Sequence, residues 1–462
     1  MSNQKDLPDK KFRNRLLGLL FVGVLMAALD IAIVGPALPA IQKQFNIDER
    51  SAAWIFSIYV LFNLAGTPLM AKLADTIGRR SIYIIDITLF AIGSLIVALS
   101  PSFSILLIGR AVQGLGSGGI FPVASAVIGD TFPEDKRGSA LGLIGAVFGI
   151  AFIIGPIIAG VLLMFSWHWL FIINIPIAVL IIAGSFKMLS NSNKSHKNVF
   201  DFQGMILLGI ILALLAYGFN QINSNNIIKS FTSFNVFPFI LIPLFLLPFF
   251  ISTEKKNNNP VLRIKLFYSK QVVLVSLLSL GAGIVEAAIV FVPPLLVSSF
   301  KVTSSTASFM LFPVVLTMAA GSPTAGRMLD KMGSKVVLII GTTLLSLGMF
   351  GLALFSESII LFYIAASISG IGMGFLLGAP LRYIMLKESQ KSERASAQGV
   401  LTLFTGIGQL FGSALVGAVA SSQGGGAAGL HVAYGLVGTI LSLLILAAFN
   451  LKNRAEEIKI TE

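Results

Sequence analysis

Residues 71–80 read AKLADTIGRR and residues 326–335 read GRMLDKMGSK, and this pair of stretches decides the fold of the chain. In each stretch an acidic residue, Asp75 or Asp330, stands three positions before a glycine. A basic residue stands two positions after that glycine, and each stretch follows a long apolar segment. Equivalent positions are offset by 255 residues, which indicates that the second part of the chain repeats the first.

Two sets of glycines extend the repeat along the chain. A single glycine in an apolar segment indicates only close helix packing, which small residues permit. The matched sets recur at offsets of 256 and 257, which is hard to obtain by chance. The pairs are Gly114, Gly116 and Gly118 with Gly370, Gly372 and Gly374, and Gly149, Gly155 and Gly160 with Gly406, Gly412 and Gly417.

The composition is that of a protein embedded in a membrane. Of its 462 residues, 55% are hydrophobic and 11% are charged, whereas a soluble globular chain is about 25% charged. The mean hydropathy is +0.90. These values exclude an ordinary soluble enzyme and a disordered chain. Cysteine is absent and the three histidines stand apart in the sequence, so thiol chemistry is excluded and no zinc-site pattern occurs.

Fourteen apolar segments are long enough to cross a bilayer, for which a helix needs roughly 20 residues. They lie at about 16–38, 52–72, 81–99, 103–127, 139–164, 168–188, 204–221, 234–252, 271–297, 304–327, 336–355, 358–384, 396–420 and 431–450. Runs of this length exclude a β-barrel. The repeat pairs the first six segments with the last six. We therefore expect an all-α polytopic membrane protein: an N-terminal six-helix bundle in 1–190, two extra transmembrane helices and linkers in 191–267, and a C-terminal six-helix bundle in 268–462.

The basic residues predict how the chain is oriented. With the N-terminus placed in the cytoplasm, 28 of the 33 Lys and Arg residues fall in inner loops and tails. Only Lys43, Arg50, Lys229 and Lys301 fall in outer loops, and Arg110 lies inside a span. Cytoplasmic loops of membrane proteins carry such an excess, so we expect both termini to be cytoplasmic. The net charge of +13 therefore does not indicate nucleic-acid binding.

Five motifs stand along the chain. They are the loop at 71–80, RAVQGLG at 110–116, GPIIAG at 155–160, Asp30 with ALP at 37–39, and WHWLF at 167–171 followed by Asn174 and Pro176. Together they resemble the major facilitator superfamily, and within it the fourteen-helix drug:proton antiporter family of the multidrug efflux type. The resemblance covers essentially the whole chain and implies the major facilitator fold.

Four charged residues lie well inside the predicted spans: Asp30, Asp86, Arg110 and Glu286. Charges in a membrane are costly, so they are candidates for function. Asp30 and Arg110 each lie about 12 Å below the outer edge, from about eight residues at 1.5 Å per residue. They can form a static salt bridge, or Asp30 can alternate between pairing with Arg110 and holding a proton, as the resemblance implies. Gln113, one turn from Arg110, is a candidate member of this site.

Glu286 and Asp86 have no evident partner in the sequence. Glu286 is either a site for a proton or a cationic substrate, or a neutral acid that hydrogen-bonds a neighbouring helix. Pro293 and Pro294 beyond it should distort the end of its helix. Asp86 lies about 8 Å from the cytoplasmic end of its span. In a structural or gating role it would snorkel to that end or meet a basic residue there. The alternative is that Asp86 couples protons directly.

The candidate gating residues are those of the repeated loops and of the antiporter motif. The resemblance implies that the first loop latches the cytoplasmic gate and that the bend at Gly155 and Pro156 separates exporters from importers. Asp75 and Asp330 can each also cap a helix N-terminus, where the dipole favours anions. The candidates are Asp75, Gly78, Arg79, Arg80, Asp330, Gly155 and Pro156.

Aromatic residues are further candidates for substrate binding. Packing or lipid contact is the better explanation for each of them, and cation–π contact with an onium compound is the alternative. These residues are Trp54, Tyr59, Phe148, Phe152 and Phe291. The substrate-binding set that we expect is Glu286, Asp30, Gln113, Phe148, Phe152 and Phe291.

The sequence contains no phosphate-binding loop and no catalytic constellation. We therefore expect neither an enzyme nor an ATP-driven pump, and no cofactor or metal. The function that we expect is proton-coupled export of amphipathic, often cationic, drugs or toxic compounds by alternating access. Its partners would be a small-molecule substrate, protons and the lipid bilayer, with the chain a monomer in a bacterial or archaeal cell membrane. Two alternatives stay open: a dedicated exporter of a lipid or metabolite, and a non-transporting membrane scaffold.

Overall fold

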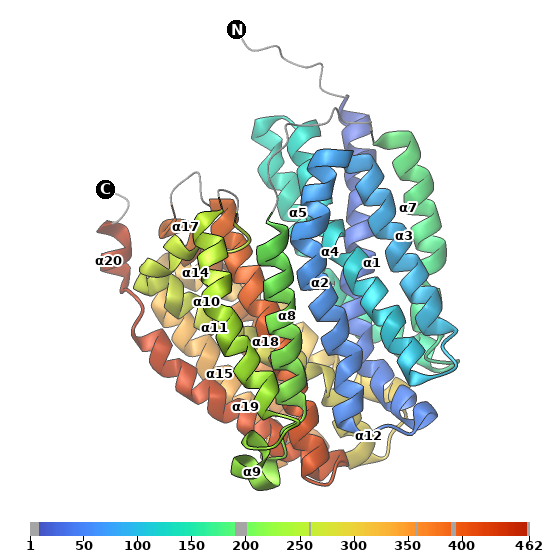
Figure 1. The fold of residues 1–462 in the computed structure, drawn as a ribbon, viewed down its shortest axis with the longest axis vertical. Coiled ribbons are helices and arrows are strands. Elements are labelled where there is room, and N and C mark those ends of the chain that lie inside the picture. Colours follow the sequence, from blue (N-terminus) through green and yellow to red (C-terminus); the bar gives the residue numbers. More distant parts are fainter. Residues whose placement is uncertain (1–8, 190–200, 258–259, 356–357, 390–393, 460–462) are drawn as a thin grey trace. The chain divides into compact units, whose positions relative to one another are not determined.

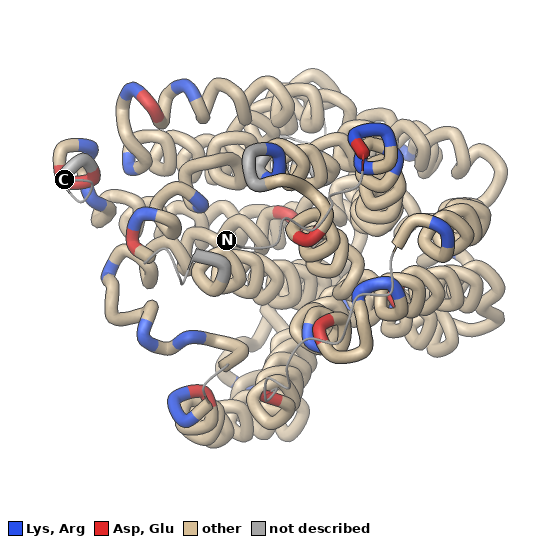
Figure 2. Tube along the Cα trace, turned by 90° about the horizontal axis from the view of Figure 1, so that it is seen from above, with Lys and Arg blue, Asp and Glu red and all other residues tan. Residues whose placement is uncertain are grey.

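The computed structural model describes residues 9–189, 201–257, 260–355, 358–389 and 394–459. Within these residues, fourteen helical spans are long and apolar enough to cross a membrane, and the predicted all-α class with fourteen transmembrane helices is confirmed. Most charged residues lie at helix ends and in linking segments, and few lie in the middle of a helix (Figure 2). This distribution is what a chain needs if the middle of each helix faces hydrocarbon or other helices.

The described residues form helices and no strand, and short segments connect most of the helices (Figure 1). Their bounds are α1 (Lys10–Phe45), α2 (Glu49–Ile77), α3 (Arg79–Ala98), α4 (Phe103–Thr131), α5 (Glu134–Leu163), α6 (Trp169–Ile172), α7 (Asn174–Met188), α8 (Phe202–Asn220), η1 (Ser224–Asn226), α9 (Ile227–Phe231), α10 (Phe237–Lys256), η2 (Ile264–Tyr268), α11 (Lys270–Val290), α12 (Val292–Phe300), α13 (Ser304–Phe309), α14 (Phe312–Met332), α15 (Ser334–Phe355), α16 (Ile359–Leu377), α17 (Ala379–Lys387), α18 (Arg394–Ser422), α19 (Gly426–Phe449) and α20 (Arg454–Lys459).

Several expected spans consist of two consecutive helices. The expected distortion near Pro293 and Pro294 is present: α11 ends at Val290, Phe291 separates it from α12, and α12 has the two prolines in its first turn. Proline lacks an N–H group, so the first turn of a helix accommodates it without loss of a backbone hydrogen bond. A second break lies at Gly378, which separates α16 from α17.

The described chain forms two compact units. The first contains residues 1–34 and 58–200, and the second contains residues 35–57 and 201–462. In the first unit, α3 packs along α4 and also contacts α6 and α7. In the second unit, α15 packs along α16, α14 packs against α16, and α11 packs along α18. The inserted helices α8 and α10 run side by side, and α8 also contacts α18 (Figure 1).

The glycines of the two repeats make equivalent contacts inside their own units. A Cβ atom on Gly118 would lie 2.7 Å from the carbonyl oxygen of Asn63, and one on Gly374 would lie 2.7 Å from that of Met318. Asn63 and Met318 are themselves 255 residues apart. The repeat found in the sequence is therefore a repeat of helix packing, in which α4 meets α2 as α16 meets α14.

A second pair of contacts extends this equivalence to the next helix. A Cβ atom on Gly116 would lie 2.7 Å from the backbone nitrogen of Phe90 on α3, and one on Gly372 would lie 2.8 Å from that of Leu345 on α15. Real Cβ atoms do not approach other atoms this closely. Each glycine thus allows a backbone-to-backbone approach that no other residue permits.

Candidate functional site

Asp30, Arg110 and Gln113 form a closed group of side chains inside the first unit. Arg110 Nη1 donates hydrogen bonds to Asp30 Oδ2 at 2.5 Å and to Gln113 Oε1 at 2.9 Å. Gln113 Nε2 in turn donates to Asp30 Oδ1 at 3.1 Å. All three side chains have zero exposure. The structure thus brings together the acid of α1 and the base of α4 that the sequence placed at equal depth.

The group continues to two residues that the sequence analysis did not select as site residues. Gln113 Nε2 donates to Ser94 Oγ on α3 at 2.7 Å, and Asn174 Nδ2 on α7 donates to the same oxygen at 3.2 Å. Ser94 and Asn174 are buried. Asn174 had been noted only as part of a motif. Ser94 and Asn174 are polar residues in apolar segments, and this is the sequence feature from which they could have been predicted as site residues.

Two aromatic rings cover the guanidinium group of Arg110. Its Cζ atom lies 4.3 Å from the ring centroid of Tyr59 and 5.8 Å from that of Phe171. Tyr59 Oη donates to Ser117 Oγ at 2.7 Å. The cation–π partner of Tyr59 is therefore the protein's own arginine, which is stabilised by the electron-rich ring faces where water is excluded.

Glu286 lies in the second unit, on a face of α11 that packs closely on α18. Gln409 Nε2 of α18 donates to Glu286 Oε2 at 2.7 Å, and Glu286 is partly buried. A Cβ atom on Gly283 would lie 2.7 Å from the backbone nitrogen of Gln409, so this glycine brings the two helices together. The structure thus contains the hydrogen bond to a neighbouring helix that was one of the two expectations for this acid.

Asp86 on α3 has zero exposure, and neither of its carboxyl oxygens has a hydrogen-bond partner in the described chain. It faces Gly119 of α4, where a Cβ atom would overlap the carboxyl group. The expectations that Asp86 snorkels or meets a base are therefore wrong, because α4 covers it completely. One turn earlier on α3, Tyr83 Oη is also buried without a partner among the described residues.

The aromatic and bend candidates are spread over both units. Phe291 is buried at the junction of α11 and α12, and Phe152 on α5 is partly buried. The side chain of Phe148 lies outside the described residues. Pro156 lies inside α5, which continues to Leu163, and a Cβ atom on Gly155 would lie 2.6 Å from that of Ala32. Gly155 thus sets the closeness of α5 to α1.

The first repeated loop holds its arginines in specific contacts. Gly78 adopts φ 113°, a conformation that favours glycine, between α2 and α3. Arg79 forms an ion pair with Asp130 and donates to the carbonyl oxygen of Ala126, both at the end of α4. The guanidinium carbon of Arg80 lies 5.2 Å from the ring centroid of Phe186.

The expected capping by Asp75 and Asp330 is wrong. Asp75 is exposed inside α2, and α3 has no side-chain cap. Asp330 is exposed inside α14. At the start of α15 the backbone nitrogen of Ser334 donates to Glu457 Oε2 at 3.4 Å instead, and Ser334 Oγ donates to Glu457 Oε1. An acid from the far end of the sequence therefore occupies the place expected for Asp330.

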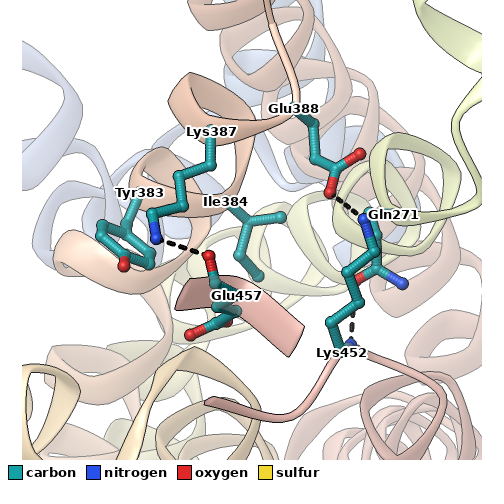
Figure 3. Close-up of a pocket in the computed structure, with 7 residues that line it drawn as sticks. All are labelled: Gln271, Tyr383, Ile384, Lys387, Glu388, Lys452 and Glu457. Carbon is teal, nitrogen blue, oxygen red and sulfur yellow. Dashed lines mark hydrogen bonds and ion pairs between the residues drawn. The ribbon is translucent and has the colours of Figure 1, made fainter. Parts of the chain in front are cut away.

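Glu457 also borders a polar cavity in the second unit (Figure 3). Lys387 Nζ donates to the carbonyl oxygen of Glu457 at 2.8 Å. On the other side of the cavity, Lys452 Nζ bonds Glu388 Oε1 at 2.6 Å, and the backbone nitrogen of Lys452 donates to Gln271 at 3.1 Å. These contacts join the ends of α11, α17 and α19 to α20.

A family model described as Major Facilitator Superfamily matches residues 20–285 and 272–461 of this chain. The chain belongs to the Major Facilitator Superfamily. It is therefore a transporter of small molecules in a membrane.

Several bacterial members of the superfamily are similar to this chain along most of its length. The "Uncharacterized MFS-type transporter YfiU" of Bacillus subtilis is 33% identical over 408 residues, which cover 87% of this chain and 79% of the relative. "Multidrug resistance protein 3" of the same species is 28% identical, covering 87% and 78%. "Riboflavin transporter RibZ" of Clostridioides difficile is 26% identical, covering 78% of each. One of these relatives is thus named for multidrug resistance and another for riboflavin transport.

Proposed function

We propose that this superfamily member is a proton-coupled antiporter that exports amphipathic, often cationic, compounds. It would act as a monomer in a bacterial or archaeal cell membrane, with both termini in the cytoplasm. Alternating access would arise from movement of the bundles at 1–190 and 268–462, with 191–267 as the inserted part. The Gly155 and Pro156 region and the loop with Asp75, Gly78, Arg79, Arg80 and its repeat at Asp330 would control gating.

The observation that carries the proposal is the fully buried group of Asp30, Arg110 and Gln113. A proton on Asp30 would remove the charge that balances Arg110. A buried charge left without its partner costs about 3–5 kcal/mol. Moving a two-state equilibrium from 1:99 to 99:1 takes about 5.5 kcal/mol. One proton at this site therefore has an energetic effect of the size that a change of conformation needs.

The environment of Glu286 supports the proposal that the substrate is cationic. It makes no ion pair within the described chain, and its one named partner is the neutral amide of Gln409. A cationic compound would supply the missing positive charge, while the amide keeps the carboxyl group oriented. The relative named "Multidrug resistance protein 3" supports drugs as the substrate class.

Efflux of a fluorescent lipophilic cation in everted membrane vesicles tests the proposal. Asp30→Asn should reduce proton-driven dye transport at least about tenfold, which corresponds to about 1.4 kcal/mol. Glu286→Gln should reduce transport of cations more than transport of neutral compounds. Glu456→Gln on the exposed side of α20 is the matched control and should leave transport unchanged. Unchanged rates and pH dependence in both Asp30→Asn and Glu286→Gln would refute the mechanism.

The relative named "Riboflavin transporter RibZ" favours a second candidate, a dedicated exporter of a metabolite. The same vesicles distinguish the two functions. A multidrug exporter should transport several unrelated cations that compete with one another. A dedicated exporter should transport no cationic dye and should accept one metabolite class, such as a flavin, in a manner that still requires Asp30.

A further inference from the structure

The inserted helices α8 and α10 contain two buried acids that none of the motifs explains. Asp201, the residue before α8, is 3% exposed, and Glu254, near the end of α10, is 2% exposed. These helices pack side by side within the second unit (Figure 1). Acidic residues are almost never this buried unless they are paired.

Each carboxyl group accepts a backbone hydrogen bond through one of its oxygen atoms. The nitrogen of Gly204 donates to Asp201 Oδ1 at 2.7 Å, and the nitrogen of Leu262 donates to Glu254 Oε2 at 2.6 Å. The remaining oxygens, Asp201 Oδ2 and Glu254 Oε1, are buried, and neither accepts a hydrogen bond from any donor in the described chain. An acceptor left unsatisfied in this way is costly.

The two unsatisfied oxygens both lie beside Gly204. A Cβ atom on Gly204 would lie 2.5 Å from Asp201 Oδ2 and even closer to Glu254 Oε1. The two side chains lie within hydrogen-bonding reach of each other. The glycine therefore provides the space in which the carboxyl groups meet. Two acceptors in contact can bond only if a donor proton lies between them.

Within the described residues, we find no basic side chain in an ion pair with either acid. The charged residues on the segments packed around it are Lys255 and Lys256 on α10, Arg263 and Lys265 at η2, and Arg394 at the start of α18, whose side chain lies outside the described residues. Lys255, Lys256 and Lys265 are exposed. Within the described chain, no ion pair joins a base to Asp201 or Glu254.

We propose that Asp201 and Glu254 form a proton-binding site that holds one proton between Oδ2 and Oε1. The proton turns a contact between two acceptors into a hydrogen bond and leaves one negative charge, which the N–H groups of Gly204 and Leu262 solvate. A metal ion fits less well, because Mg²⁺ and Ca²⁺ take six or more oxygen ligands. No group of three or more metal-ligating residues occurs among the described residues.

The site joins both ends of the inserted hairpin. Asp201 directly precedes α8, Glu254 lies near the end of α10, and Leu262 belongs to the segment that leads to η2 and α11. Loss of the shared proton would put two like charges in contact and separate these three points. The site is independent of Asp30, so it stands whether or not the chain exchanges protons for substrates.

Thermal unfolding of the purified full chain, followed from about pH 6 to about pH 9, tests the site. The thermal midpoint of both proteins is followed as the pH rises toward the alkaline end of this range. The decrease for the wild type should be about 2–4 °C larger than the decrease for Glu254→Gln. The glutamine amide can donate to Asp201 Oδ2 at every pH, so it replaces the shared proton. Glu456→Gln is the matched control, because Glu456 is exposed and also accepts one backbone bond, from Asn453 at 2.8 Å. It should follow the wild type.

Infrared spectroscopy gives a second, direct readout. Glu254→Gln and Asp201→Asn should each remove one carboxylic-acid C=O band at neutral pH, and the double variant should remove no more than either single variant. Gly204→Ala should weaken the same band by separating the oxygens. The proposal is overturned if wild type and Glu254→Gln lose stability in parallel with rising pH, if the double variant removes two bands, or if Mg²⁺ stabilises only the wild type. Dye efflux by Glu254→Gln, measured at neutral pH, should equal that of the wild type, which separates this site from the transport mechanism.

Discussion

The buried pair of Asp30 and Arg110 predicts a large energetic coupling between these two positions. Replacing Arg110 by Met removes the bonds to Asp30 Oδ2 at 2.5 Å and to Gln113 at 2.9 Å, and leaves a carboxylate in an environment with zero exposure. Breaking a buried pair on one side costs about 3–5 kcal/mol. Arg110→Met should therefore lower the stability of the purified protein by about that amount.

The double variant Asp30→Asn/Arg110→Met provides the decisive comparison. The amide that Asp30→Asn introduces would keep the acceptor for Gln113 Nε2 at 3.1 Å but carry no charge, so no unpaired charge remains. The double variant should recover about 2 kcal/mol or more relative to Arg110→Met, because contacting residues couple by about 0.5–3 kcal/mol. Unfolding by denaturing detergent measures both values. Additive effects of the two single changes would refute the pairing, whatever their size.

Three further outcomes follow from other contacts. Gly118→Ala and Gly374→Ala should each destabilise the fold by about 1–3 kcal/mol through overpacking. Gly129→Ala on α4 should instead stabilise it, because a Cβ atom there meets nothing within 4 Å. Thermal midpoints measure all three effects, and effects of opposite sign at positions 118 and 374 would contradict the packing repeat. Asp86→Asn should fold and transport as the wild type does if the carboxyl group stays neutral, and a lost pH dependence of dye efflux would instead indicate that Asp86 releases a proton. Burial raises the pKa of Asp48, but hydrogen bonds from Ser421 and Ser51 outweigh burial and hold this pKa below 3.8. The ionised Asp48 side chain therefore adds a small stabilisation of the fold above that pH, which is lost below it. The thermal unfolding midpoints of Asp48→Asn and wild type should differ at neutral pH and converge in acid.

Much of the fold could be predicted from the sequence because hydrocarbon imposes a strict length and polarity on every span. The fourteen spans and the packing duplication signalled by Gly118 and Gly374 follow from local pattern alone. The depth of Asp30 and Arg110 in the membrane could also be predicted, since both stand in continuous helices. In a helix, depth is the number of residues from the end multiplied by the rise per residue.

Other parts depend on contacts between segments distant in sequence. Gln409 lies 123 residues from Glu286, and Glu457 lies 123 residues from the Ser334 that it contacts. No periodicity encodes which helix faces another, so Glu457 could not be foreseen as the residue that caps α15. Asp201 and Glu254 were passed over because each stands at a span end, where an acid ordinarily reaches water.

Proton flux during dye transport tests the central claim most directly. The purified chain in liposomes, loaded with a pH-sensitive dye and given a lipophilic cation, should move protons opposite to the cation and in proportion to it. Asp30→Asn should abolish the proton movement, while Glu456→Gln should leave it intact. Cation transport that continues in Asp30→Asn with an unchanged ratio of protons to cation would contradict the account.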